Sequence, residues 1–585
     1  MKYRSCFLFC TAVFLTTAVL TSCTHEKPSS EELFFQALEQ NAAENFTDAV
    51  HSFSFCIEND DEWADVASEQ LLNLLSEHPG LEVSQTVLKT ARRYHPLKTT
   101  QVSARKDYPL TYSAESLSSF SYAMIDEIAS SWLSSDADKH KAAGLLAQAV
   151  SLKKEKTVSP DEKEELWLLL FYTGRMYEKC GSSCWKTALD YYDEARTFSY
   201  SDLTSDRALW YYLELSRKSD PRGMARKLNT YAASWHDNSY FDDFFDRLAA
   251  DVLSNYDWSS FYTVFQNNES FMSPSIKAKY AYISARLIYT GLIMIENDER
   301  TVSEITAGLY QTVFNNAEPG SYYDILTHYV TGIPFTPAGI DETEGDAFAE
   351  RLLGGLIEHD YQELTSHYLN RFCSSLSTQV IKNAYSYLLS KSGSENDYLS
   401  LTSLALKTAR NRQNDTDLMH LAFPAYYRTY VEAEARSNNL EPWLLFALIH
   451  SESCFQADIT SVAGANGLTQ LMASTAGDIA RKLKVSEYDL TDAPTNIRFG
   501  SFYLSELIGR LDGDILLAAF SYNAGITRVR NWKKQAPELP SDIFLETIPY
   551  EETRLYGQKI TRASVMYGML WYDENFAEII EKLIF

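Results

Sequence analysis

The feature that most constrains the fold is helical periodicity over most of the chain. From about residue 33 to about residue 420, apolar residues recur at spacings of three and four, and alternating stretches are few. This spacing places apolar side chains on one face of a helix, whereas a strand needs a period of two. With 585 residues, the chain also exceeds what one hydrophobic core usually organises. We therefore expect an all-α protein with two or more packed units.

One segment of this region carries a more specific pattern. Residues 166–198 place Gly174 on one predicted helix and Ala188 and Tyr192 on the next. Small residues at a helix crossing, with aromatic side chains in the holes, resemble a tetratricopeptide helix pair whose turn is slightly lengthened. Because no strict repeat period extends over the region, we expect an irregular α-superhelix at 33–421. Such a stack serves either as a scaffold or substrate cradle, or only as helical filler.

The N-terminus resembles a bacterial lipoprotein signal. Basic residues precede an apolar run of about 15 residues, which fits a signal-peptide core and is short for a membrane span. The run ends in Leu-Thr-Ser-Cys23, similar to the lipobox whose cysteine is acylated and becomes the first residue. We expect a signal peptide at 1–22, a lipid anchor on Cys23 and a polar tether at 23–32. An ordinary cleaved signal and an uncleaved anchor are the alternatives.

The charge balance argues against nucleic acid as a partner. The net charge is −27 and the isoelectric point is near 4.9. Nucleic-acid binding depends on Lys and Arg displacing counterions from phosphates, and an acidic surface repels them. The plainer role of this acidity is to keep a large protein soluble.

Five cysteines follow the predicted signal. Cys180 and Cys184 could close a small disulfide loop in an oxidising envelope. No second Cys or His pair stands beside them in the sequence at zinc-ligand spacing. We therefore expect a structural turn there, and no metal site. The five are Cys56, Cys180, Cys184, Cys373 and Cys454.

The character of the sequence changes near Phe423, and we expect a second domain at 422–585. A helix is expected from about 440 to 453, where Asn439 can cap the N-terminus. Glu452 follows two leucines at four-residue spacing, so its carboxyl ends an apolar stripe. Desolvation at that position raises the pKa of the carboxyl, as a general acid requires. From this pattern alone, a solvated or ion-paired glutamate is the commoner alternative.

A polar, glycine-rich stretch follows Glu452. It has the pattern ES-x7-S-x2-GA-x-GL-x-QLM. Glycines let a loop approach a ligand closely, and Ser and Gln offer uncharged hydrogen bonds, which suits sugars. Further along, Tyr522 and Asn523 join an aromatic ring to an amide, and Tyr556 lies in the segment 548–560.

Together these motifs resemble the soluble-type lytic transglycosylases of the goose-lysozyme-like superfamily, over about a quarter of the chain. The helical region before them is more weakly similar to the superhelix of the large soluble member. The resemblance implies a lysozyme-like α-helical catalytic domain. It implies that Glu452 is the catalytic acid/base. It implies substrate binding by Ser453, Ser461, Gly467, Gln470, Met472, Tyr522, Asn523 and Tyr556.

The resemblance also implies a reaction. The MurNAc-GlcNAc β-1,4 bond of peptidoglycan is cleaved with formation of 1,6-anhydro-MurNAc ends, with neither metal nor cofactor. Glycosidases usually use two carboxylates, but the nearest further one, Asp458, is expected to be a solvated loop residue. A hydrolytic goose-type muramidase and an inactive peptidoglycan-binding scaffold are the alternatives.

Three positions depart from the family pattern. The family usually has Met at Thr469, Pro at Ala473 and Val at Gly557. These departures bear on the shape of the glycan groove more than on catalysis.

His450 could suggest a hydrolase triad, but no G-x-S-x-G elbow accompanies it, so we expect a helix-surface histidine. Cys454 is expected to be a packed small residue rather than a nucleophile.

The signal and the resemblance together imply a location. We expect a protein of the bacterial envelope that is lipid-anchored and faces the periplasm. Thr24, after the lipidated cysteine, favours the outer membrane. The expected partners are peptidoglycan strands, the membrane through Cys23, and cell-wall proteins on the superhelix, with no nucleic acid.

Overall fold

The protein is all-α, as predicted. The computed structural model has thirty α-helices and two short strands within the residues that it describes. None of the helices in these residues is both long and apolar enough to cross a membrane. The predicted signal peptide and Cys23 lie outside the described residues, which are 28–95, 108–155, 163–295, 299–335, 345–391, 398–408 and 415–585.

The chain divides into two compact units, 1–104 and 105–585. In the first unit, four helices pack in chain order. α1 begins at Ser30, before the predicted start of the helical region, because Ser29 and Glu32 form a capping box. The predicted tether at 23–32 therefore overlaps the first helix. The four helices are α1 (Ser30–Ala42), α2 (Phe46–Asn59), α3 (Ala64–Glu77) and α4 (Gln85–Tyr94).

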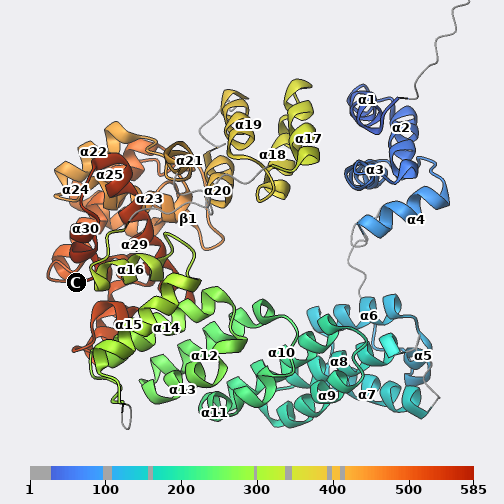
Figure 1. Ribbon diagram of the computed structural model, residues 1–585, viewed down its shortest axis with the longest axis horizontal. Helices are drawn as coiled ribbons and strands as arrows, with labels where there is room; N and C mark the ends of the chain where they lie inside the picture. Colours follow the sequence, from blue (N-terminus) through green and yellow to red (C-terminus); the bar gives the residue numbers. More distant parts are fainter. Residues whose placement is uncertain are drawn as a thin grey trace, which may run out of the picture. The chain divides into compact units, whose positions relative to one another are not determined.

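The second unit begins with successive helices, most of which pack against their chain neighbours (Figure 1). They are α5 (Ala114–Ser119), α6 (Tyr122–Ser134), α7 (Lys139–Glu155), α8 (Lys163–Lys179), α9 (Trp185–Thr197), α10 (Asp202–Ser219), α11 (Pro221–Ala232), α12 (Asp242–Ser254), α13 (Trp258–Asn268), α14 (Pro274–Tyr289), α15 (Val302–Asn316) and α16 (Tyr322–Thr331). Five more follow, α17 (Ala347–Glu358), α18 (Gln362–Phe372), α19 (Thr378–Lys391), α20 (Tyr398–Thr408) and α21 (Thr416–Ala422).

The predicted helix pair is α8 and α9. A Cβ atom on Gly174 would lie 2.7 Å from the ring of Tyr192 and 3.3 Å from the carbonyl oxygen of Ala188. Tyr192 is fully buried, so its ring occupies the space that the glycine leaves open. The small residue thus sits at the helix crossing and the aromatic one fills the hole, which is the arrangement that the sequence predicted.

The C-terminal helices surround one long helix, α29 (Glu551–Tyr572). α23 (Pro442–Ser453) packs along it, and α26 and α30 contact it as well. The predicted domain boundary at 422 lies inside the second compact unit and stays a prediction. The other elements here are α22 (Arg428–Ser437), β1 (Ala465–Asn466), β2 (Leu471–Met472), α24 (Ala473–Leu483), α25 (Ala493–Arg510), α26 (Ile515–Ala524), α27 (Ile526–Gln535), α28 (Ser541–Thr547) and α30 (Phe576–Leu583).

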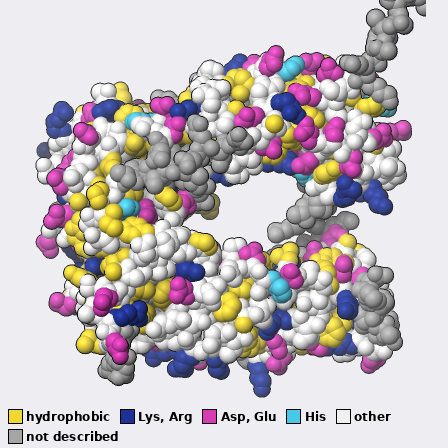
Figure 2. All heavy atoms as spheres, viewed as in Figure 1, with side chains coloured by type: hydrophobic (Ala, Val, Ile, Leu, Met, Phe, Trp, Pro, Cys, Tyr) yellow, Lys and Arg dark blue, Asp and Glu magenta, His cyan; other side chains and the backbone are white. Residues whose placement is uncertain are grey.

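A buried ion pair joins the helical succession to the C-terminal helices. Arg286 of α14 donates to Asp542 of α28 with an Nε to Oδ2 distance of 2.6 Å. Tyr282 of α14 donates to the same oxygen at 2.9 Å. Only 8% of the arginine side chain and none of the aspartate is exposed. Elsewhere on the surface, acidic side chains are spread over the face seen in Figure 2, with Lys and Arg among them.

Candidate active site

α23 carries the predicted catalytic carboxylate, Glu452, at its C-terminal end. The helix runs Pro442–Ser453, close to the predicted range. Asn439 does not cap it, because its φ of 52° turns the chain before the N-cap residue, Glu441. Every residue of α23 from 443 to 450 is buried. Glu452 therefore ends an apolar helix, as the sequence predicted.

The Glu452 carboxyl is half-buried, and its pKa is raised from 4.5 to about 7. Burial is the main cause, because surrounding protein atoms replace the water that would solvate the charged form. A hydrogen bond from Tyr556 lowers the pKa, the negative charge of Glu552 raises it, and the positive charge of Lys559 lowers it. The net result is a carboxyl that holds a proton near neutral pH, as a general acid needs.

Tyr556 of α29 is the direct partner of Glu452. Its hydroxyl donates a hydrogen bond of 2.7 Å to Oε1 of Glu452. Tyr556 is buried, and burial together with the charge of Glu452 raises the pKa of the phenol well above 10. The phenol therefore keeps its proton as a donor. The structure brings these two predicted site residues together across the α23 and α29 interface.

The loop that follows α23 is held by its own polar groups. The Ser453 hydroxyl donates to the carbonyl oxygens of Leu468 at 2.8 Å and Ile449 at 3.2 Å. The Gln470 amide donates to the carbonyl oxygens of Gly467 at 2.8 Å and Ile459 at 3.2 Å. Strands β1 and β2, which flank Gly467 and Gln470, pair antiparallel. The loop shape is thus set before any ligand arrives.

Two residues expected to bind substrate are buried in the structure. Ser453 is 3% exposed, and its hydroxyl is committed to the backbone. Gly467 is buried with a φ of 74°, and a Cβ atom there would lie 2.1 Å from the carbonyl oxygen of Leu490. A contact of either residue with substrate stays a prediction. In the structure both shape the loop, because the Ser453 hydroxyl ties it to α23 and the backbone of Gly467 lets it pack closely.

Other predicted substrate residues remain accessible. Met472 is 42% exposed. Ser461 is half-buried, and its hydroxyl accepts a hydrogen bond of 3.0 Å from the backbone N–H of Ala465. That hydroxyl still has its own proton to donate to a ligand. Asp458, in the same loop, is exposed as expected.

Tyr522 and Asn523 end α26 and connect it to the site. The Tyr522 hydroxyl donates to the carbonyl oxygen of Thr469 at 2.9 Å. Burial, followed by the charge of Glu452, raises the pKa of Tyr522 well above 10. Asn523 accepts from the Thr553 hydroxyl at 2.8 Å and donates to Glu552 at 3.3 Å. This amide therefore links α26 to the first turn of α29.

The sequence reasoning missed Glu552 and Lys559. Both are exposed on α29, and their charges act on Glu452 with opposite signs. They stand four residues before and three residues after Tyr556, so all three side chains share one helix face. That spacing was the available signal. From its spacing to Tyr556, Glu552 could have been predicted to lie near Glu452.

The departures from the family pattern lie mostly in packed positions. Thr469 is fully buried, and its hydroxyl donates to Asn496 at 2.6 Å. A Cβ atom on Gly557 would lie 2.3 Å from the ring of Phe520, so this ring fills the space of a larger side chain. Ala473 is exposed. Two of the three differences are thus accommodated inside the protein.

His450 is not the surface residue that the sequence predicted. It is 9% exposed, and its Nε2 lies 3.1 Å from the carbonyl oxygen of Ala422. Its ring stacks on Phe423 with centroids 5.1 Å apart. Burial lowers its pKa to about 4. The reason for the error is that the segment before α22 covers this face of α23. Cys454 donates from its thiol to the His450 carbonyl oxygen and is partly buried, as a packed residue would be.

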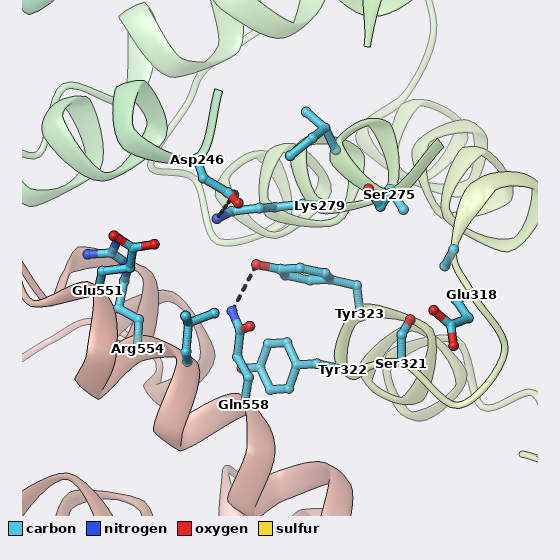
Figure 3. A pocket seen from close by; sticks show the side chains of 14 residues that line it. Asp246, Ser275, Lys279, Glu318, Ser321, Tyr322, Tyr323, Glu551, Arg554 and Gln558 are labelled. Carbon is cyan, nitrogen blue, oxygen red and sulfur yellow. Dashed lines mark hydrogen bonds and ion pairs between the residues drawn. The ribbon is translucent and has the colours of Figure 1, made fainter. Parts of the chain in front are cut away.

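A separate cavity of about 240 Å³ lies between α29 and the earlier helices α12, α14 and α16 (Figure 3). Tyr323 and Gln558 point toward one another across it, with a hydrogen bond of 3.1 Å. Lys279 and Asp246 form an ion pair of 2.7 Å. The polar lining residues are Asp246, Ser275, Lys279, Glu318, Ser321, Tyr322, Tyr323, Glu551, Arg554 and Gln558.

This cavity is distinct from the Glu452 site. Arg554 and Gln558 are each two residues from Tyr556 along α29, which is about 200° around a helix. α29 therefore turns one face to the cavity and another to Glu452. Two pairs of lining groups bond to one another, Lys279 with Asp246 and Gln558 with Tyr323. Tyr323 also donates to the buried carboxyl of Glu546 at 2.9 Å. The cavity belongs to the joint between the helical succession and α29.

Comparison with known proteins agrees with the resemblance seen in the sequence. Residues 429–545 match the Transglycosylase SLT domain family, and the chain therefore contains such a domain. This segment includes Glu452, the loop after it, and Tyr522 and Asn523. It ends before Tyr556.

The matched relatives are bacterial proteins. A Haemophilus influenzae protein, whose name includes the words soluble lytic murein transglycosylase, is 34% identical over 163 residues, which are 27% of this chain and 28% of that protein. The soluble lytic murein transglycosylase of Escherichia coli K12 is 28% identical over 163 residues, 27% of this chain and 25% of that protein. The match thus spans about a quarter of each curated relative's length.

Two solved structures are similar along most of the chain. The lytic transglycosylase Slt of Pseudomonas aeruginosa, as an inactive variant, is 19% identical, with 95% of this chain and 84% of that chain covered and a TM-score of 0.45. A complex of a 70-kDa soluble lytic transglycosylase with bulgecin A is 13% identical, with 94% and 93% covered and a TM-score of 0.47.

Proposed function

We propose that this protein is a lytic transglycosylase that cleaves the MurNAc-GlcNAc β-1,4 bond of peptidoglycan. The observation that carries the proposal is the Glu452 carboxyl. Its pKa is raised to about 7 and it accepts a hydrogen bond from Tyr556. It lies within the segment that matches the SLT domain. A partly buried, protonated carboxyl in a sugar-cleaving domain is suited to protonate a glycosidic oxygen.

The proposed reaction uses Glu452 twice. First the carboxyl gives its proton to the bridging oxygen, the bond from that oxygen to C1 of the muramoyl sugar breaks, and the substrate's N-acetyl group stabilises the cationic centre. The resulting carboxylate then takes the proton of the C6 hydroxyl of the same sugar, whose oxygen bonds to C1. The product is a 1,6-anhydro end, and Glu452 regains its proton. No water is consumed.

The accessible residues supply the proposed substrate contacts. Ser461, with a hydroxyl proton to donate, and the exposed Met472 lie on the loop and on strand β2. Tyr522 and Asn523 are half-buried near the end of α26. Gln470 stays a candidate through its carbonyl oxygen, because its amide group is committed to the loop backbone.

A second candidate function is hydrolysis by a muramidase, and one observation favours it. Glu552 is close enough to raise the pKa of Glu452. A second carboxylate is what a hydrolase needs to activate water or to stabilise the cationic centre. Glu552 is exposed and accepts a hydrogen bond from Asn523, so it would act from the solvent side.

Digestion of purified sacculi tests both functions. The wild type, Glu452→Gln and the exposed-site control Glu538→Gln are compared, and the products are identified by mass. We expect anhydro ends from the wild type and the control, and a loss of about 100-fold or more in Glu452→Gln. Reducing ends would instead support the muramidase. No products from any of the three proteins would support an inactive peptidoglycan-binding scaffold, and equal products from all three would rule out Glu452 as the catalytic acid.

We also propose that the protein is lipid-anchored through Cys23 and faces the periplasm from the outer membrane. The apolar run and the Leu-Thr-Ser-Cys motif support the anchor, and Thr24 supports the outer membrane. The relatives above carry the word soluble in their names, so the anchor would distinguish this chain from them. The helices before 422 would then hold the catalytic domain and offer surface to cell-wall proteins.

Metabolic labelling tests the anchor. Cells that express the wild type are grown with a labelled fatty acid, and the envelope is fractionated. We expect label on the protein and recovery with the outer membrane, and neither in Cys23→Ser. Cys56→Ser is the matched control, since Cys56 is a buried cysteine. Release of the unlabelled wild type into the soluble fraction would contradict the proposal.

A further inference from the structure

Three side chains of the second unit bring metal-binding atoms together. They are His140 near the start of α7, Cys180 just after α8 and Cys184 in the turn that follows. Their ligand atoms all lie within 4.8 Å of one another. Among the residues that the structure describes, this is the group of His, Cys, Asp and Glu side chains that could hold a metal ion. Sequence reasoning missed it because His140 stands 40 positions before Cys180.

The backbone places the two thiols. α8 ends at Lys179, and the N–H of Cys180 donates to the carbonyl oxygen of Met176 at 3.1 Å. Gly181 then adopts a φ of 101°, and the N–H of Cys184 donates back to its carbonyl oxygen at 3.0 Å. This one-turn reversal is needed to lead α8 into α9, and it points both cysteines to the same side.

Helix packing places the imidazole. α7 packs along α8, and the two helices share a buried core with α9. His140 is exposed at the first turn of α7, beside the end of α8 because the two helices are antiparallel neighbours in a hairpin. The three ligands therefore come from two pieces of backbone, the start of α7 and the turn between α8 and α9, that the core already holds together.

The types of donor atom in the cluster indicate which metal ion would bind. Two thiolates and one imidazole are soft to borderline donors, which suit Zn²⁺, whereas Ca²⁺ and Mg²⁺ prefer oxygen. In a tetrahedral site, bonds of about 2.3 Å to sulfur and about 2.0 Å to nitrogen leave the donors roughly 3.5–3.8 Å apart. The described cluster needs only small side-chain adjustments to reach this spacing.

We propose that His140, Cys180 and Cys184 bind one Zn²⁺ ion, with a fourth position open to water or an external ligand. The alternative use of the two cysteines is a disulfide, since an oxidising compartment favours it. The position of His140 favours the metal site, because its ring nitrogen lies within 4.8 Å of both sulfur atoms and a disulfide makes no use of a third donor. The ion would fix the turn between α8 and α9 to the start of α7.

Metal titration of the full chain tests the proposal. The protein is purified in detergent under reducing conditions, freed of metal with a chelator, and titrated with Zn²⁺, and separately with Co²⁺ as a spectroscopic probe. We expect one equivalent of Zn²⁺ and a thiolate-to-cobalt charge-transfer band. His140→Ala and Cys180→Ser should each weaken binding by about 100-fold or more.

Cys56→Ser and Cys373→Ser are the matched controls, because both are buried thiols elsewhere in the protein, and they should bind as the wild type does. Because His140 is exposed, His140→Ala keeps the helix core intact, so a loss of binding there is a loss of a ligand. The proposal is overturned if the reduced wild type takes up no zinc, or if His140→Ala binds as tightly as the wild type. The test does not depend on peptidoglycan cleavage.

Discussion

The hydroxyl of Tyr556 donates a hydrogen bond of 2.7 Å to Oε1 of Glu452, across 104 positions of the chain. The bond holds one oxygen of a carboxyl whose pKa lies near 7. A hydrogen bond to the ionised form stabilises it and therefore opposes the effect of burial. Tyr556 thus both positions Glu452 and keeps its pKa from rising further.

Removing this hydroxyl should slow the reaction and shift its pH dependence. For Tyr556→Phe we expect a loss of activity of about 10- to 100-fold, the usual value of a hydrogen bond to a charged group. Because the bond lowers the pKa of Glu452, its loss should move the alkaline limb of the pH profile to higher pH. The rate of sacculus digestion across pH measures both effects. Tyr550→Phe, at an exposed tyrosine before the same helix, should match the wild type. An unshifted alkaline limb would contradict the assignment.

The two charged neighbours on α29 should move the pH profile in opposite directions. Glu552 raises the pKa of Glu452 and Lys559 lowers it. Glu552→Gln should therefore shift the alkaline limb to lower pH, and Lys559→Gln should shift it to higher pH. High salt should shrink both shifts, since both residues are exposed. Glu551→Gln, at the neighbouring exposed position, is the control. Shifts of the same sign in both variants would rule out a direct electrostatic effect.

Neutralising Glu452 should stabilise the protein at high pH. Its pKa rises from 4.5 to about 7 on folding, so the ionised form is disfavoured in the folded state. The folded state is therefore unpenalised below about pH 4.5, loses stability as the pH rises toward 7, and carries the full cost above it. At about 1.4 kcal/mol per unit, that cost is up to about 3 kcal/mol. Glu452→Gln should raise the free energy of unfolding at pH 8 and leave it unchanged at pH 4. Equal effects at both pH values would contradict the raised pKa.

The sequence predicted the parts of the site that lie on one element or one motif. The apolar stripe before Glu452 is a local property of α23, and the motif after it is dense enough to be read without a structure. The bond between Glu452 and Tyr556 could not be derived from spacing, because it depends on how α23 packs on α29.

The error at His450 has the same cause. His450 looked like a surface residue because nothing local indicates that the chain near Phe423 covers it. The motif around Ser453 likewise does not reveal that its hydroxyl turns inward to Leu468. Fold class followed from periodicity, but the irregular helix lengths depend on individual caps such as Ser29 and Glu32.

The helix crossing at Gly174 should not tolerate a larger residue. A Cβ atom there meets the buried ring of Tyr192 at 2.7 Å, so Gly174→Ala should lower the free energy of unfolding by about 1–3 kcal/mol. In Gly308→Ala, the new Cβ atom meets nothing within 4 Å. Because glycine is a poor helix former, that control should be neutral or stabilising by up to about 1 kcal/mol. Urea unfolding measures both. Equal destabilisation would contradict close packing of α8 on α9.

The buried pair of Arg286 and Asp542 should couple the stability of the early helices to that of the catalytic region. Asp542→Asn leaves the buried guanidinium without its counter-charge, at a cost of about 3–5 kcal/mol. Asp478→Asn breaks an exposed pair with Arg481, whose side chains are 62% and 78% exposed, and should cost less than about 1 kcal/mol.

A double variant separates charge from packing. Arg286→Leu combined with Asp542→Leu removes both charges at once, so no unpaired ion is left buried, and it should recover most of the stability lost in Asp542→Asn. Because α28 leads directly into α29, which carries Tyr556, the single variant should also lose activity at a lower temperature than the wild type. Thermal unfolding and thermal inactivation of sacculus digestion measure the two effects together. If Asp542→Asn unfolds at the wild-type temperature, the ion pair contributes nothing to the stability of the joint.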